Sequence, residues 1–185
     1  MDTINAKRRL REELHGRRDD PGSRRLPPSI ESLVETEVWQ RSQCVASYLP
    51  RGTEQTPSGI DALVLSSGRT LAYPRVVSAG QMVFKRHVQE APLEKAAYGI
   101  LAPEASAPTL DVQSIDLFLV PLLACDDRGV RLGYGGGYYD RVLAEAGGFR
   151  CGVGFAFQRV TALPNEDHDA RLHGYLCETG MELFA

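Results

Sequence analysis

Strand and helix patterns alternate along most of the chain. The clearest strand signal is residues 115–123, an almost unbroken apolar run that is typical of a strand covered on both faces of a sheet. Further strands are predicted at residues 44–49, 70–77 with an interruption at Pro74, 82–88, 151–157 and 175–178. This alternation predicts an α/β fold with a mainly parallel sheet sandwiched by helices.

Four segments have helical spacing. They are residues 2–17, residues 29–41 with Ser29 as N-cap, residues 58–67 with Gly68 as the stop, and residues 138–146. In the first helix, Ile4, Leu10 and Leu14 can share one apolar stripe, while basic residues occupy the remaining surface. Residues 92–98 are predicted as a short helix or turn. The turn-rich residues 19–28 follow a segment too short to be a domain, so residues 1–185 are expected to form one domain.

Composition narrows the class of protein. The chain has 185 residues, of which 43% are hydrophobic and 24% charged, and its net charge is −3. These values are ordinary for a soluble globular protein and argue against nucleic-acid binding through bulk positive charge. The N-terminus is too polar for a signal peptide, and every apolar run is far shorter than the ~20 residues of a membrane span. Four cysteines without C-x-x-C spacing are expected to be inert thiols, so we expect a cytoplasmic protein with no membrane or nucleic-acid partner.

Residues 127–141, DRGVRLGYGGGYYDR, carry the strongest chemical signal. They follow the clearest predicted strand, and the carboxyl ends of parallel strands are where ligands bind. The loop contains four closely spaced glycines: Gly133, Gly135, Gly136 and Gly137. Their backbone N–H groups can approach an anion closely, Arg131 can donate to phosphate, and Asp140 can hold Mg²⁺. The spacing matches neither standard nucleotide motif, and a tight structural turn is the alternative interpretation.

The run VPLLACDDRGVRLGYGGGYYDR resembles the signature of the 5-formyltetrahydrofolate cyclo-ligase family, also called 5,10-methenyltetrahydrofolate synthetases. Shorter segments match this family in the same order: KRRLR at residues 7–11, SYLPRGTEQT at 47–56, YPR at 73–75, YGI at 98–100 and PNEDHD at 164–169. The resemblance implies a fold like that of sugar-phosphate isomerases and CoA transferases. It also implies conversion of 5-formyltetrahydrofolate to 5,10-methenyltetrahydrofolate with MgATP, releasing ADP and phosphate. The implied partners are ATP and the folate, with or without a polyglutamate tail, and a monomer is expected.

The resemblance also implies roles for individual residues. The ATP-binding set is Lys7, Arg8, Arg9, Leu10, Arg11, Arg131, Leu132, Gly133, Tyr134, Gly135, Gly136, Gly137, Tyr138 and Tyr139. The folate contacts are Glu54, Tyr134 and Tyr138, and the Mg²⁺ ligands are Asp140 and Asp169. Arg131 and Tyr138 are assigned to catalysis. Gln55 or Thr53 are alternatives to Glu54, because the turn is one residue shorter than the usual family turn.

Several aromatic and ionisable residues have a structural interpretation. Trp39, Tyr73, Phe84 and Tyr98 are expected mainly in the core, with the wall of the ligand pocket as the alternative for the last three. His168 and His173 are expected to be structural, with a general base and a replacement for the missing acid as their respective alternatives. The chain departs from the family pattern in two places: Ala102 replaces a frequent glutamate, and Leu172–His173 replaces a valine–aspartate pair. The first departure puts a carboxylate role at position 102 in doubt, and the second removes an acid near the presumed metal.

Charge is unevenly distributed along the chain. Residues 1–25 contain eight Lys and Arg residues but only five Asp and Glu residues. This local excess predicts a positive pocket despite the net charge of −3. Two other functions remain open. One is an enzyme that uses the glycine loop for a different phosphorylated substrate, because a fold does not fix a function. The other is a non-catalytic nucleotide- or folate-binding module.

Overall fold

A computed structural model describes residues 3–20, 26–166 and 169–184. Within these residues, eight strands form the main sheet in the order β13-β12-β10-β7-β1-β2-β3-β6. Their bounds are β1 Cys44–Ala46, β2 Thr70–Ser78, β3 Gln81–His87, β6 Thr109–Leu110, β7 Leu117–Pro121, β10 Phe149–Val153, β12 Gly174–Cys177 and β13 Gly180–Leu183. The central strands β12, β10, β7, β1 and β2 are parallel, whereas β13, β3 and β6 pair antiparallel at the edges. The predicted mainly parallel sheet is confirmed.

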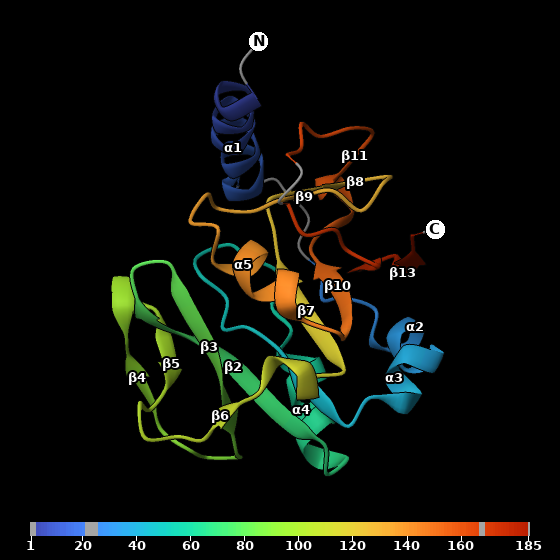
Figure 1. Ribbon diagram of the computed structural model, residues 1–185. Helices are drawn as coiled ribbons and strands as arrows, with labels where there is room; N and C mark the ends of the chain where they lie inside the picture. The colour runs from blue at the N-terminus through green and yellow to red at the C-terminus, as the bar shows by residue number, and fades with distance from the viewer. Residues whose placement is uncertain (1–2, 21–25, 167–168, 185) are drawn as a thin grey trace.

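Helices cover both faces of this sheet (Figure 1). The helices are α1 Thr3–Asp19, α2 Ile30–Val34, α3 Glu37–Arg41, α4 Ser58–Ser66 and α5 Tyr138–Glu145. On one face, Leu143 of α5 packs in a core cluster with Phe118 of β7. On the other face, side chains of α2, α3 and α4 pack in a cluster with Leu117 and Leu119 of the same strand. Because alternate side chains of β7 enter opposite cores, its sequence is apolar throughout.

Smaller elements complete the chain. Strands β8 Ala124–Asp126, β9 Arg131–Leu132 and β11 Arg159–Val160 form one small sheet, and β4 Leu93–Lys95 pairs with β5 Leu101–Pro103. Short 3₁₀ helices occur at Ala97–Gly99, Val112–Ser114 and Ala156–Gln158. In the described part of the chain, no helix is both long and apolar enough to cross a membrane. The four cysteines, all in that part, are free thiols as expected.

The prediction of one continuous helix over residues 29–41 is wrong, because the segment forms two helices. Ser29 does cap α2, since its hydroxyl accepts from the Ser32 N–H at 3.4 Å. The helix ends at Val34, however, and α3 starts anew after Thr36. The Thr36 hydroxyl donates to the Leu33 carbonyl at 2.7 Å and accepts from the Trp39 N–H at 3.1 Å. These side-chain bonds compete with the helical ladder and divide the segment in two.

Other element boundaries also differ from the predictions. Strand β2 runs through Pro74 without interruption, because β1 pairs with β2 only as far as Ala72 and no neighbour on that side needs the missing N–H. Residues 92–98 contain strand β4 before a 3₁₀ turn. The strand predicted at 151–157 ends at Val153, and the strand predicted at 44–49 ends at Ala46. Short strands of this kind depend on partners distant in sequence, which local patterns do not reveal.

The buried face of α1 differs most from the face predicted for this helix. Ile4, expected on the apolar stripe, is 63% exposed. The buried residues of this helix are Lys7, Leu14 and Arg18. Two of the three are cations, so an apolar pattern could not identify this face. A cationic face needs oxygen acceptors opposite it, and those acceptors line the site described below.

We predict that Asp61 makes the fold less stable as the pH rises through weakly acidic values. This α4 carboxyl is 8% exposed and accepts a hydrogen bond from the Tyr73 hydroxyl at 2.9 Å. Burial raises the pKa of Asp61 from 3.8 to about 6, so the folded state holds this proton more tightly than the unfolded chain. The free energy of unfolding should therefore fall as the pH rises from about 4 to about 6.

The variant Asp61→Asn mimics the protonated acid and should remove this fall. Relative to wild type, it should gain up to about 3 kcal/mol between pH 4 and pH 7, measured by urea unfolding. Glu13→Gln, a change at an exposed position of α1, controls for the loss of a carboxylate. Parallel pH profiles for wild type and Asp61→Asn would contradict the prediction.

Candidate active site

A cavity of about 610 Å³ lies beyond the carboxyl ends of β1 and β7. The chain passes from β1 to β2 on one side, and β7 then pairs on the other side of β1, so the strand order reverses here. Such a switch point is where ligands bind in open α/β sheets. The lining includes α1, the turn after β1, strands β2 and β3, the turn at Ala97–Gly99, the glycine loop, and the segment with Glu166 and Asp169.

Lys7 lies between two carboxylates at one end of the cavity. Its ammonium group donates to Asp169 at 2.6 Å and to Glu166 at 2.8 Å, and the residue is only 6% exposed. Burial alone would lower the pKa of Lys7, but the hydrogen bonds and charges of Asp169 and Glu166 outweigh it and raise that pKa. Lys7 therefore stays charged, and this charge is held at the cavity wall.

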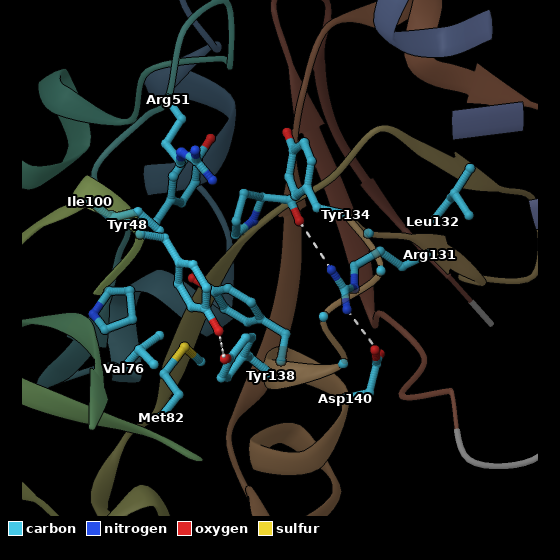
Figure 2. Close-up of a pocket in the computed structure, with 18 of the residues that line it drawn as sticks. Tyr48, Arg51, Val76, Met82, Ile100, Arg131, Leu132, Tyr134, Tyr138 and Asp140 are labelled. Atoms are coloured by element: carbon cyan, nitrogen blue, oxygen red, sulfur yellow. Dashed lines mark hydrogen bonds and ion pairs between the residues drawn. The ribbon is translucent and has the colours of Figure 1, made fainter. Parts of the chain in front are cut away.

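Arg131 forms the second cation–carboxylate pair of the cavity. Its Nη2 donates to Asp140 at 2.9 Å, as a dashed line in Figure 2 shows. Its Nη1 donates to the Pro121 carbonyl at 3.2 Å. Its guanidinium also lies 5.6 Å from the ring centroid of Tyr139. Arg131 Nε and the Tyr139 hydroxyl are buried without a hydrogen-bond partner among the described residues. A buried donor without a partner is costly, so these atoms favour an oxygen-rich ligand.

The glycine loop lies between these cations and helix α5. The Nε of Arg11 donates to the Gly133 carbonyl at 2.9 Å, which joins the loop to α1. A Cβ at Gly133 would come within 2.6 Å of the Arg131 guanidinium, so a side chain there would displace that group. Gly137 precedes α5 in the left-handed region, with φ of +64°, which other residues rarely adopt. The loop therefore requires glycine for both close approach and backbone geometry.

Glu54 and Tyr134 form a polar pair at the other end. Glu54 Oε2 accepts from the Arg51 N–H at 2.7 Å, in the turn after β1. The Tyr134 hydroxyl accepts from Arg18 Nη1 and lies close enough to the Glu54 carboxylate to be affected by its charge. Burial and the negative charge of Glu54 raise the pKa of Tyr134, and Arg18 opposes that shift. Tyr134 is thus neutral and can act as a hydrogen-bonding group beside a carboxylate.

The remaining walls are largely apolar. Figure 2 shows Val76, Met82 and Ile100 on one side of the cavity, with Arg131 and Asp140 on the other. The turn at Ala97–Gly99 reaches the glycine loop through Tyr98, whose hydroxyl lies 2.9 Å from the Tyr138 hydroxyl. A flat ring system held by a few polar groups suits such walls, and an anion suits the end that holds Lys7, Arg11 and Arg131.

The structure brings together most residues that the sequence predicts for the site. The cavity is lined by Lys7, Arg11, Glu54, Arg131, Leu132, Gly133, Tyr134, Gly135, Gly136, Gly137, Tyr138, Tyr139, Asp140 and Asp169. Arg8 and Arg9 are exposed outside this lining, and Leu10 packs against a core cluster. Thr53 and Gln55 also lie outside it, with Thr53 bonded to Arg18 and Gln55 to the Leu26 carbonyl. The functional roles of all these residues remain predictions.

Other expectations have mixed outcomes. Trp39, Tyr73 and Phe84 are buried as expected, but Tyr98 is 66% exposed at the cavity. His173 is structural in that its Nδ1 accepts from the Arg150 N–H at 3.2 Å, and burial lowers the pKa of His173. His168 lies outside the described residues.

Sequence reasoning overlooked Tyr48, Glu166 and Arg18. The first two line the cavity, and Arg18 is bonded to Tyr134. Arg18 could have been found from its spacing, because it follows Lys7 by eleven residues and Leu14 by four, on one helix face.

The prediction of a positive pocket is wrong. Among the described lining residues, four cations (Lys7, Arg11, Arg51 and Arg131) accompany four acids (Glu54, Asp140, Glu166 and Asp169). The cavity is therefore balanced in charge and not strongly positive. The excess of cations along the N-terminal sequence does not produce a positive pocket, since Arg8 and Arg9 face outward and Lys7 is paired with acids.

Comparison with known proteins adds independent information. The model of the 5-formyltetrahydrofolate cyclo-ligase family matches residues 3–178. A 5-formyltetrahydrofolate cyclo-ligase of Haemophilus influenzae is 32% identical over 99 residues, which cover 51% of this chain and 53% of that protein, about half its length. A mouse protein of the same name is 28% identical over 194 residues, covering 95% of this chain and 96% of its own. The NMR structure of Aquifex aeolicus 5,10-methenyltetrahydrofolate synthetase superposes with a TM-score of 0.79 at 26% identity, covering 96% and 92% of the two chains.

We predict that Lys7 contributes to stability through its two carboxylates. Lys7→Met keeps the aliphatic stem but leaves Glu166 and Asp169 without this cation. Removing one partner of a buried ion pair is strongly destabilising, and the partial exposure of Glu166 moderates the effect to about 2 kcal/mol. Urea unfolding at pH 7 measures it, with Arg8→Met as the exposed control on the same helix. Equal losses in the two variants would show that the paired carboxylates do not depend on Lys7.

Proposed function

Because the chain belongs to the 5-formyltetrahydrofolate cyclo-ligase family, we propose that it converts 5-formyltetrahydrofolate and ATP into 5,10-methenyltetrahydrofolate, ADP and phosphate. One observation carries this proposal. A single cavity contains cations and a glycine loop at one end and a tyrosine–carboxylate pair with apolar walls at the other. The first end suits the phosphates of ATP, and the second suits a flat ring with hydrogen-bonding edges.

The proposed chemistry transfers one phosphoryl group. The γ-phosphoryl group of ATP passes to the formyl oxygen, leaving ADP, and N10 of the folate then attacks the activated formyl carbon. The C–O bond breaks as the ring closes, and the phosphate leaves with that oxygen while the proton of N10 is lost to the phosphate or to water. Such a transfer depends mainly on positioning and charge stabilisation.

Arg131 suits the charge-stabilising role in this reaction. Arginine carries a permanent, planar charge, and the Nε of Arg131 is a buried donor with no hydrogen-bond partner in the described part of the chain. Lys7 and Arg11 are four residues apart on one face of α1, so both can contact the same polyphosphate. Tyr138 lies at the start of α5, between the glycine loop and Tyr98, where its hydroxyl can contact the reacting end of the folate. Glu54 and Tyr134 hold the pterin in this arrangement.

The residues present fit a magnesium ion. Mg²⁺ is usually held by one or two carboxylates together with substrate phosphates and water, and Asp140 and Asp169 both line the cavity. Among the described residues, no group of three or more metal-binding side chains converges. The equal number of cations and acids also favours a companion cation for the anionic ATP. When bound, Mg²⁺ would neutralise phosphate charge.

A direct assay tests the proposed function. Wild-type protein is mixed with MgATP and 5-formyltetrahydrofolate, and the near-ultraviolet absorbance of the methenyl product is followed alongside ADP release. We expect an ATP-dependent rise with one ADP per product. Folate binding without turnover would instead support the non-catalytic module, and absence of folate binding would favour a different substrate.

We predict that Asp140→Asn shifts the magnesium dependence of this activity. The amide keeps the size of the side chain but is a weaker ligand for a hard cation. The Mg²⁺ concentration for half-maximal rate should rise by at least about tenfold, because a lost charged contact of roughly 1.4 kcal/mol corresponds to that factor. A titration of the initial rate with Mg²⁺ at fixed total ATP measures the shift.

Glu145→Gln is the matched control for this experiment. It lies on the same helix, is exposed, and is outside the cavity lining. Its magnesium dependence should equal that of wild type. An unchanged titration for Asp140→Asn would remove Asp140 from the metal site without affecting the proposed reaction.

A further inference from the structure

Three cations follow one face of helix α1. Lys7, Arg11 and Arg18 occupy positions i, i+4 and i+11, which repeat on the same side of an α-helix. From Lys7 to Arg18 the helix rises about 16 Å, at 1.5 Å per residue. Lys7 contacts Asp169 at one end of the cavity and Arg11 contacts the glycine loop, whereas Arg18 reaches Tyr134 at the other end. One rigid helix thus spans both proposed subsites.

Arg18 is almost completely buried although it does not line the cavity. It is 4% exposed, and its Nε donates to the Thr53 hydroxyl at 3.0 Å. Its Nη1 donates to the Tyr134 hydroxyl, and the guanidinium lies 5.5 Å from the centre of that ring. Its Nη2 lies 3.5 Å from His15 Nδ1. The guanidinium therefore connects α1 to two loops that are far apart in sequence.

Both of these contacts lead to Glu54. Thr53 is its neighbour in the chain, and the Thr53 hydroxyl also donates to Asp19 at the end of α1. Tyr134 and Glu54 line the same cavity, and the charge of the Glu54 carboxylate acts on the Tyr134 hydroxyl. Arg18 thus holds the side chain of Thr53, the residue before Glu54, and the side chain of Tyr134 in the same cavity. The planar guanidinium can do both at once because its donors diverge in a fixed fork.

We propose that Arg18 is a positioning residue for the folate end of the site, acting through Tyr134 and the Thr53–Glu54 turn. This inference rests on the proposed function. The carboxylate and the tyrosine must be correctly placed to bind the edge and face of a pterin, and a site held by a supporting group binds more tightly than a loose one. Arg18 itself does not touch the substrate.

Steady-state kinetics of Arg18→Met tests this role. The KM for 5-formyltetrahydrofolate should rise about tenfold, the effect expected for loss of a hydrogen bond to a charged group. The KM for ATP should change by less than about twofold, because Lys7 and Arg11 keep their own contacts. If Arg18 only held α1 in place, its loss would displace Lys7 and Arg11 as well, and both KM values would rise together. That result would overturn the proposal.

A double-mutant cycle with Tyr134→Phe gives a second measurement. The phenylalanine lacks the hydroxyl that accepts from Arg18, so the double variant should bind folate about as weakly as the weaker single variant. Additive losses would show that Arg18 does not act through Tyr134. Arg18→Lys should restore only part of the folate affinity, since one ammonium group cannot reproduce the fork. Full recovery would contradict the geometric argument.

Arg17→Met is the matched control, being an adjacent and exposed arginine of the same helix. It should leave both KM values unchanged. Calorimetric titration with 5-formyltetrahydrofolate repeats the comparison without turnover. If wild type binds folate but does not react, the proposed function fails while the Arg18 proposal is still decided by binding. If wild type is active and Arg18→Met binds folate normally, only the Arg18 proposal fails. Absence of folate binding by wild type overturns both.

Discussion

Helix α1 is attached to the rest of the protein in large part through three cations, of which Lys7 and Arg18 are buried. Burying a charged group is costly unless hydrogen-bond acceptors replace water. Lys7, Arg11 and Arg18 find these acceptors in two carboxylates, a loop carbonyl and two hydroxyls, all on segments that form the cavity. Helix α1 can therefore pack in this position only when the segments that form the site are correctly arranged. An apolar helix could pack in several orientations, whereas this one needs its acceptors in place.

The sheet explains why those acceptors come together. The strand order reverses between β1 and β7, so the segments that follow these two strands diverge and leave a space at the carboxyl edge. The Glu54 turn follows β1, and the glycine loop follows β7 after the β8–β9 hairpin. Helix α1 covers both segments and closes the space from outside. The cavity is thus made by the topology, and α1 adds much of its charge.

The sequence could predict those parts that local patterns encode. The buried strand β7, the glycine loop before α5 and the end of α4 before Gly68 all have strong local signals, and they are where predicted. The failures have another origin. Thr36 divides a helix through its own side-chain bonds, and the pairing of β1 decides whether Pro74 interrupts β2. The cationic face of α1 can be identified only from its acceptors, which lie 35 to 122 residues away along the sequence in the bonds of Arg18 to Thr53 and of Arg11 to Gly133.

Charge balance connects the fold to the proposed chemistry. Lys7 and Arg131, the two cations best suited to phosphate, are already paired with carboxylates. These pairs keep buried charges compensated in the protein by itself. Binding of a polyphosphate with a divalent cation would allow an exchange of partners, in which phosphate oxygens take the lysine and arginine while the metal takes the carboxylates. Each charge would remain compensated before and after. A chain of net charge −3 can therefore bind an anion without a positive pocket, provided that the anion brings its own cation.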